Sequence, residues 1–123
     1  MGILKTVEGG VTAAKGFEAA GVEAAVKYQN RKDMALVYSA TPCKVAGVFT
    51  SNVVKAAPVV WDQKIVASAP YVQAVVVNSG IANACTGEKG MEYCQKTAKA
   101  VENTLGIPAN QVLVASTGVI GMQ

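Results

Sequence analysis

The sequence predicts a layered α/β or α+β fold in which a mixed sheet is backed by helices. Short apolar runs rich in β-forming residues recur along the chain, which indicates several strands. Between residues 87 and 106 the apolar residues instead follow the period of a helix. The resulting order is strands first, then strand, helix and strand, and this order is typical of a sheet with helical cover.

The first half of the chain is expected to contribute extended segments. Residues 9–27, GGVTAAKGFEAAGVEAAVK, are alanine-rich, but glycines interrupt them before a stable helix could form, so we expect an extended or looped stretch. Residues 34–40 (MALVYSA) and 45–50 (VAGVFT) predict the two strands of a hairpin. Residues 58–67 (PVVWDQKIVA) predict another strand, in which Trp61 is a packing anchor.

The second half predicts a strand, a helix and a strand. Residues 71–77 (YVQAVVV) read as a buried strand, and their three successive valines predict cover on both faces. The helix that follows has Thr86 as an N-cap that accepts a first-turn N–H, and Gly106 as a left-handed C-cap. Residues 111–116 are expected to form the next strand. The apolar face of the helix comprises Met91, Cys94, Ala98, Val101 and Leu105.

The length and composition of the chain indicate a single domain with unusually few charged residues. With 123 residues the chain has the size of a single domain without an internal linker. Hydrophobic residues make up 51% and charged residues 15%, against about 25% charged in typical soluble domains. We therefore expect much of the surface to be covered, either by a larger assembly or by the rest of a longer polypeptide.

Charge and hydropathy exclude two classes of partner. The net charge of +3 is spread along the chain, and the basic pair Arg31–Lys32 stands alone, so no nucleic-acid surface is expected. The uncharged stretch 65–87 is interrupted by polar residues and by Pro70, so we expect no membrane-spanning helix. No secretory signal is evident after Met1, and we expect a cytoplasmic protein.

Cysteine and histidine usage limits the chemistry. Three cysteines, Cys43, Cys85 and Cys94, are odd in number and far apart, which favours reduced, mostly buried thiols. Without histidine the chain has no credible zinc ligand set, and it cannot build Ser-His-Asp or Cys-His catalysis alone. We expect no metal and no resident cofactor.

Residues 78–87, NSGIANACTG, join the buried strand to the helix. Small residues in such a turn can bring backbone N–H groups to a ligand, but the segment matches neither dinucleotide nor P-loop patterns. We therefore expect Asn78, Asn83 and Thr86 to satisfy local backbone groups. Cys85 has no base nearby in sequence and is expected to be a packed thiol rather than a nucleophile.

Residues 112–121, VLVASTGVIG, place a hydroxyl and a glycine where an apolar strand runs out. One interpretation is an ordinary turn, because Ser, Thr and Gly are common turn formers. The other is chemical, since the Thr117 hydroxyl and the Gly118 backbone N–H can hold developing negative charge. Composition alone favours the turn.

Four stretches together favour the chemical interpretation. They are GGVTAAKGFEAAGV near the start, AGVFTSNVVKAAPV at 46–59, AVVVNSGIANACTG at 74–87, and VLVASTGVIG near the end. In this order they resemble the N-terminal part of the α chain of the ornithine acetyltransferase family, the glutamate N-acetyltransferases of arginine biosynthesis. The resemblance covers nearly the whole chain and implies the layered α/β fold of that family.

The resemblance implies a precursor that cuts itself, so that a threonine becomes the N-terminal nucleophile of a separate β chain and its α-amine the base. The enzyme passes acetyl from N-acetylornithine to glutamate, releasing ornithine, and some members accept acetyl-CoA as donor. Thr117 and Gly118 correspond to the family's oxyanion hole. The assembly implied is an α2β2 heterotetramer.

The same resemblance implies that the nucleophile lies outside this chain. Its sole Ala-Thr dipeptide, Ala40–Thr41, falls in the expected hairpin and precedes Pro42. Residues 1–123 are therefore expected to be a single-domain fragment, inactive alone. Two alternatives remain open: a non-catalytic small-molecule binding or regulatory domain, and a self-processing aminopeptidase of related fold.

Overall fold

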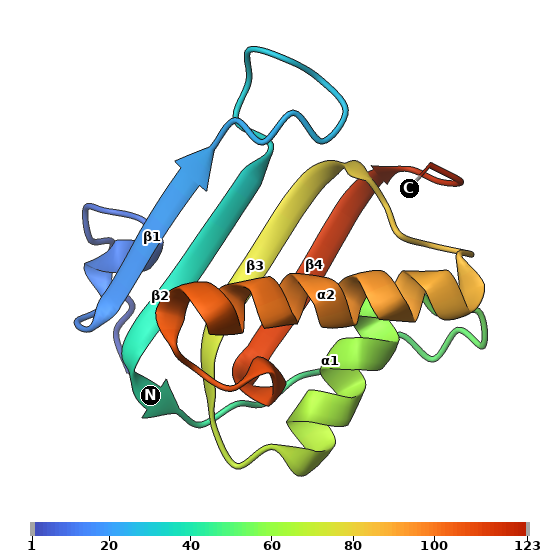
Figure 1. Ribbon diagram of the computed structural model, residues 1–123. Helices are drawn as coiled ribbons and strands as arrows, with labels where there is room; N and C mark the ends of the chain where they lie inside the picture. Colours follow the sequence, from blue (N-terminus) through green and yellow to red (C-terminus); the bar gives the residue numbers. More distant parts are fainter. Residues whose placement is uncertain (1, 123) are drawn as a thin grey trace.

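The computed structural model describes residues 2–122, which form one four-stranded sheet, two α-helices and two short 3-10 turns (Figure 1). No helix in this range is long and apolar enough to cross a lipid bilayer. In chain order the elements are η1 (Val11–Ala13), β1 (Phe17–Val22), β2 (Met34–Cys43), α1 (Ala57–Ser68), β3 (Val72–Ile81), α2 (Gly87–Leu105), η2 (Ala109–Gln111) and β4 (Val112–Val119).

Both kinds of strand pairing occur in the sheet, whose order is β1-β2-β3-β4. β1 pairs with β2, and β2 with β3, in antiparallel fashion, whereas β3 and β4 are parallel. Parallel neighbours need a crossover connection, and α2 supplies it. α2 therefore lies across one face of the sheet (Figure 1). The predicted mixed sheet backed by helices is confirmed.

α2 follows the predicted helix closely, because its apolar stripe has a core to pack on. It ends at Gly106, whose φ of 71° is the predicted left-handed cap. Thr86 occupies the N-cap position as predicted, but its hydroxyl donates to Asn83 Oδ1 at 2.7 Å instead of accepting a first-turn N–H. The buried cluster to which α2 and the sheet both contribute comprises Ala57, Ala74, Val76, Cys94, Ala98, Val101, Ile107, Val112 and Val114.

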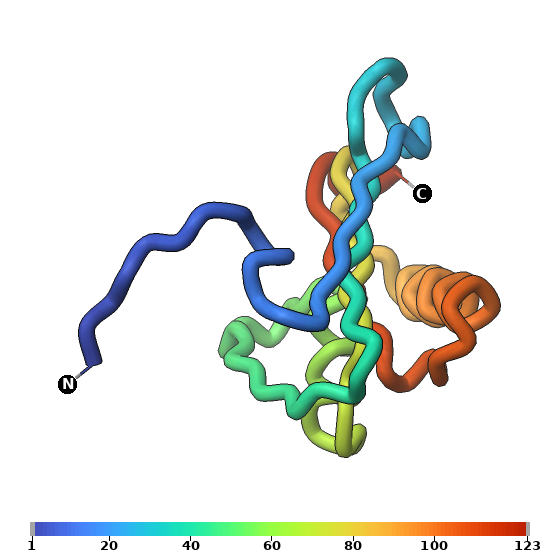
Figure 2. Tube along the Cα trace, turned by 90° about the vertical axis from the view of Figure 1, so that its left-hand side faces the viewer, coloured from blue at the N-terminus to red at the C-terminus, as the bar shows by residue number. Residues whose placement is uncertain are grey.

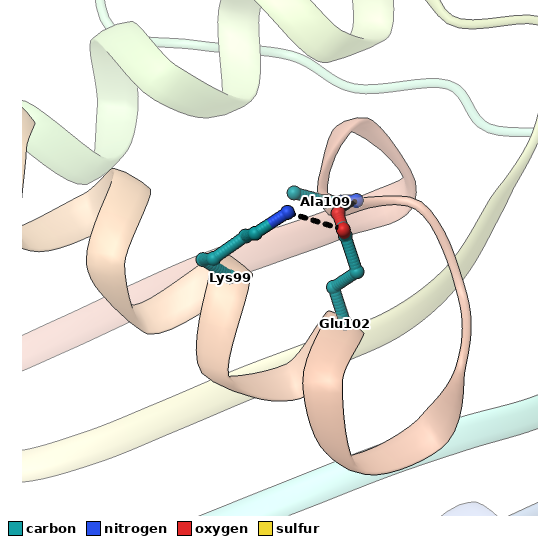
Figure 3. A network of polar contacts seen from close by, with 3 residues as sticks. All are labelled: Lys99, Glu102 and Ala109. Atoms are coloured by element: carbon teal, nitrogen blue, oxygen red, sulfur yellow. Dashed lines mark hydrogen bonds and ion pairs between the residues drawn. The ribbon is translucent and has the colours of Figure 1, made fainter.

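The C-terminal end of α2 is tied to the turn that leads into β4 (Figure 3). The Glu102 carboxylate accepts a hydrogen bond from Lys99 Nζ and another, at 2.7 Å, from the Ala109 backbone N–H. The Lys99 ammonium, followed by the Ala109 N–H, lowers the pKa of Glu102 below its usual value. One side chain thus links α2 to η2, the turn that precedes β4.

The strand predicted at residues 58–67 is wrong, because this segment forms α1. Pro58 lies in the first turn, where a helix tolerates proline. Ile65 is buried, whereas Val59, Val60 and Val66 are half-buried, so the apolar residues do not gather on one stripe. A segment that packs on several sides shows no clear helical period, which explains the error.

α1 covers the outer edge of β4. The Trp61 indole N–H donates to the Val112 carbonyl at 2.9 Å, and the Val114 N–H donates to Asp62 Oδ1 at 2.9 Å. Trp61 also packs against the buried cluster, as predicted. Partial burial raises the pKa of Asp62 to about 6, although the Val114 N–H acts in the opposite direction. These two side chains satisfy backbone groups that an edge strand leaves unpaired.

The predicted hairpin is also wrong. β2 runs through Pro42 to Cys43, with a register shift against β3 between Tyr38 and Cys43, so the expected turn is strand. Residues 45–50 are not a strand, and the antiparallel partner of β2 is β1. Within the segment expected to be extended or looped, residues 17–22 are this strand. The Asp33 carboxylate closes the connecting loop by accepting the Ala24 and Val26 N–H groups, both at 2.7 Å.

The two faces of the sheet differ in cover. Figure 2 shows the sheet nearly edge-on, with α2 on one side and the N-terminal segment on the other. In β3, Val72, Ala74 and Val76 are buried, whereas Val75 and Val77 on the opposite face are only half-buried. The predicted cover on both faces is therefore incomplete within residues 2–122. We call the side away from α2 the open face.

The last residues of β3 and β4 approach each other through two glycines. Gly80 pairs with Gly118, and both have positive φ, 116° and 133°. A Cβ atom on Gly118 would overlap the Gly80 carbonyl group, closer than any side chain tolerates. Glycine is therefore required at position 118 by the strand pairing itself.

Replacing Asp62 with Asn tests the edge contact. Because the folded pKa lies above the unfolded value of 3.8, the folded chain holds an extra proton between about pH 4 and 6, and its stability falls as the pH rises through that window. Asp62→Asn keeps an oxygen for the Val114 N–H without the charge. We expect it to raise the free energy of unfolding by about 1 kcal/mol above pH 6, discounted for partial solvation, and by nothing near pH 3.

Urea unfolding at pH 3, 5 and 8 measures this difference, with Glu92→Gln as control. Glu92 has its pKa lowered by Lys96, so its removal should cost stability at neutral pH instead of adding it. A stability gain in Asp62→Asn that is equal at pH 3 and pH 8 would contradict the assigned origin.

Gly118→Ala tests the close approach of β3 and β4. The added methyl group meets the Gly80 backbone in a strained conformation, and we expect a loss of about 2 to 4 kcal/mol. Gly121→Ala is the matched control, because Gly121 also has positive φ, 89°, but nothing lies within 4 Å of its added Cβ. It should lose only about 1 kcal/mol. Equal losses in urea unfolding would mean that backbone strain, not the contact, fixes Gly118.

Candidate functional site

Thr117 and Gly118 lie near the C-terminal end of β4, opposite Ser79 and Gly80 of β3. Both residues are exposed. The turn interpretation of this stretch is wrong, because β4 continues through both residues to Val119. The structure thus presents the predicted pair on the last part of a strand, accessible from outside.

The Gly118 N–H points away from the neighbouring strand. Alternate residues of a strand direct their N–H and C=O groups to opposite edges. The Val112 carbonyl and the Val114 N–H form hydrogen bonds with side chains of α1. The backbone groups of Val112, Val114 and every second residue after them therefore face the outer edge of the sheet. Val119, in the other phase, accepts from the Ala82 N–H just beyond β3 at 3.0 Å. Gly118 shares the phase of Val114, and its N–H is directed to the outer edge, where β3 does not use it.

The Thr117 side chain belongs to the open face. Along β4, Val112 and Val114 are buried toward α2, and Ser116 lines a cavity on that side. Thr117 alternates with them and therefore projects from the opposite face. Its hydroxyl and the Gly118 N–H are two hydrogen-bond donors at the corner where the open face meets the outer edge of β4.

The prediction that Asn78, Asn83 and Thr86 satisfy local backbone groups in a loop is only partly right, because β3 runs through Asn78 to Ile81 and the Thr86 hydroxyl donates to the Asn83 side chain. Asn78 Nδ2 donates to the Ile81 carbonyl at 3.0 Å, and Asn83 Nδ2 donates to the Gly90 carbonyl at 3.0 Å. Asn78 also makes a contact across the sheet, because its Oδ1 accepts a 2.5 Å hydrogen bond from the Ser116 hydroxyl of β4. This last contact joins β3 to β4, the strand that carries the candidate pair.

No local sequence pattern predicts the Asn78–Ser116 contact, although the burial phase of the two strands carries a signal for it. Asn78 continues the buried phase of Val76, and Ser116 continues that of Val114. Polar residues at such positions need a partner when they leave water, and each supplies it to the other. Their separation of 38 residues hides the pairing from local patterns.

The cysteines are free thiols, but they are not mostly buried as predicted. Cys94 is buried, Cys43 is half-buried, and Cys85 is exposed with a φ of 56°, so it is not a packed thiol. Burial, followed by the nearby Asp62 carboxylate, raises the pKa of Cys94 to about 11. Such a thiol stays protonated at neutral pH and is a poor nucleophile.

A cavity of about 220 Å³ lies between α2 and the sheet, on the face opposite the Thr117 side chain. Its polar lining comes from Asn78 of β3, from Asn83, from α2 and from Ser116 of β4, whereas Thr117 and Gly118 do not contribute. The cavity and the candidate pair are therefore on different sides of β4. The lining residues are Val26, Met34, Asn78, Ile81, Asn83, Tyr93, Cys94, Thr97, Val114, Ser116 and Met122.

Relatives of this chain are named for arginine biosynthesis. The arginine biosynthesis bifunctional protein ArgJ of Thermotoga neapolitana is 51% identical over 110 residues, which are 89% of this chain and 28% of that protein. The protein of the same name from Gloeobacter violaceus is 49% identical over 116 residues, 94% of this chain and 29% of the relative. The chain thus spans less than a third of these relatives.

Two solved structures share the fold. The crystal structure of ArgJ from Bacillus halodurans matches with a TM-score of 0.86 and 44% identity, over 93% of this chain and 59% of that one. The structure of ornithine acetyltransferase from Mycobacterium tuberculosis, complexed with ornithine, matches with a TM-score of 0.87 and 46% identity, over 92% and 61%. The sequence profile of the ArgJ family matches residues 18–123. This chain therefore belongs to the ArgJ family, as its resemblance to ornithine acetyltransferases predicted.

Proposed function

We propose that this chain is the N-terminal segment of an enzyme that transfers acetyl from N-acetylornithine to glutamate in arginine biosynthesis, and that it supplies the oxyanion hole. The single observation that carries the proposal is the exposed pair of donors at the end of β4. The Thr117 hydroxyl lies on the open face, and the Gly118 N–H is directed to the adjacent outer edge.

The chemistry requires such donors at the carbonyl oxygen. Attack on the N-acetyl amide of the substrate converts a planar carbonyl into a tetrahedral intermediate with negative charge on oxygen. Donors that are already oriented stabilise this charge without reorganising during the reaction. The absence of a side chain at Gly118 also allows the substrate to approach the backbone closely.

The attacking group is proposed to come from elsewhere in the same precursor. The resemblance to ornithine acetyltransferases implies an N-terminal threonine as this nucleophile, with its own α-amine as the base, and such a pair works without a histidine. That threonine would be freed by self-cleavage and would begin a separate β chain. Because this chain corresponds to less than a third of its relatives, we propose that residues 1–123 are inactive alone.

Further features of the whole enzyme follow from the same proposal. Two copies each of the α and β chains would form a cytoplasmic heterotetramer with no metal and no resident cofactor. Ornithine would be the first product, which agrees with the ornithine bound in the Mycobacterium tuberculosis relative. Acetyl-CoA would serve as an additional acetyl donor. The family membership favours this transferase over a binding domain or an aminopeptidase.

Thr117→Val in the full-length polypeptide that carries this segment tests the proposed role. The change keeps the β-branched shape and removes the hydroxyl, so we expect the fold to persist. The rate of acetyl transfer from N-acetylornithine to glutamate should fall at least tenfold, toward the roughly 100- to 1000-fold loss typical of an oxyanion-hole donor.

Thr104→Val is the matched control. Thr104 is an exposed threonine whose hydroxyl only bonds the Ala100 carbonyl of its own helix, so its loss should leave the rate unchanged. Circular dichroism and thermal unfolding establish that both variants fold. Wild-type turnover in Thr117→Val would remove Thr117 from the mechanism.

A further inference from the structure

A side-chain bridge joins β3 and β4 just before the candidate donors. Asn78 and Ser116 are register partners, and the Ser116 hydroxyl donates to Asn78 Oδ1 at 2.5 Å. The next register pair is Ser79 with Thr117, and the one after it is Gly80 with Gly118. The bridge therefore fixes the strand spacing one residue before the proposed oxyanion hole begins.

The amide nitrogen of the Asn78 side chain bonds a residue beyond the Gly80–Gly118 pair. Asn78 Nδ2 donates to the Ile81 carbonyl at 3.0 Å, on the far side of Gly80. Beyond it, the Ala82 N–H donates to the Val119 carbonyl at 3.0 Å. The Gly80–Gly118 approach is thus held from both sides, by one side chain that contacts both strands and by one backbone bond.

This arrangement bears on the direction of a single N–H group. The peptide unit between Thr117 and Gly118 is planar, with its C=O and N–H on opposite sides. Since the Gly118 N–H is directed to the outer edge, the Thr117 carbonyl faces β3, and the register places it near Gly80. Any rotation of β4 against residues 79–81 turns the whole unit and redirects the N–H.

We propose that Asn78 and Ser116 are positioning residues for the oxyanion hole and hold the Gly118 N–H and the Thr117 hydroxyl in their catalytic orientation. This inference rests on the proposed function. Neither residue contacts the substrate in this arrangement, because both line the cavity on the α2 side of the sheet, opposite the Thr117 side chain. Their effect passes through the backbone of β4.

The test is Ser116→Ala in the full-length polypeptide, assayed for acetyl transfer from N-acetylornithine to glutamate. Loss of the bridge should lower kcat about tenfold, because small misplacements of catalytic groups are costly. KM for N-acetylornithine should change less than about twofold, since the donors act mainly in the transition state. Ser116→Thr retains a hydroxyl and should restore most of kcat.

A double variant separates positioning from a general loss of stability. In a Thr117→Val background, where one donor is already gone, Ser116→Ala should lower kcat by clearly less than in the wild type. Ser68→Ala is the control, because the Ser68 hydroxyl bonds only the Lys64 carbonyl of α1. It should leave kcat unchanged in both backgrounds.

The outcomes distinguish this inference from the proposed function. If Thr117→Val slows the reaction but Ser116→Ala does not, or if the two losses simply multiply, the positioning role is overturned and the oxyanion hole stands. If Thr117→Val itself is fully active, the proposed function fails. Should Ser116→Ala not fold, Asn78→Asp decides instead. It still accepts from Ser116 but cannot donate to the Ile81 carbonyl, so a similar fall in kcat supports the inference and a wild-type kcat overturns it.

Discussion

The parallel pairing of β3 with β4 constrains most of the remaining structure. It requires a crossover, which α2 provides, and the crossover buries the apolar face of α2 on both strands. It brings residues 78–81 beside residues 116–119, although almost 40 positions separate them in the sequence. At the end of the pair the backbones come so close that Gly118 has no room for a side chain.

The position of β4 at the border of the sheet has a second consequence. An edge strand leaves one row of backbone groups without a strand partner, and these groups attract other strands unless they are covered. α1 covers two of them with Trp61 and Asp62, in the first half of β4. The Gly118 N–H belongs to the same row, farther along an exposed segment. The same edge thus has a part protected by a helix and a part available for chemistry.

Local patterns of apolar residues in the sequence predicted the helices and strands that bury one continuous face against the core. α2 has a continuous apolar stripe and a glycine cap, so both its existence and its end could be read from the sequence. β3 was equally clear from its valines. α1 could not be predicted, because its apolar residues meet different neighbours on several sides. β1 lies in a stretch that was expected only to be extended or looped, because all six of its residues are exposed and leave no alternation that would define a strand.

The location of the candidate donors could be predicted, but the reason for their geometry could not. Resemblance to a family drew attention to Thr117 and Gly118, whereas composition alone pointed to a turn, which β4 does not contain there. In the proposed arrangement the orientation of the pair depends on Asn78 and Gly80 of β3, which lie beside β4 only because α2 returns the chain to the neighbouring position in the sheet.

The requirement for glycine at position 118 and its proposed chemical role have the same origin. Because Gly118 has a positive φ, a Cβ atom at this position would point toward Gly80. Any residue other than glycine would therefore clash with the Gly80 backbone. The alternation of backbone groups along β4 directs the Gly118 N–H away from Gly80, to the outer edge of the sheet. A residue with a side chain would have to push β4 away from β3, and that movement would turn the N–H as well. Packing therefore selects glycine at the position where catalysis would need a fixed backbone donor.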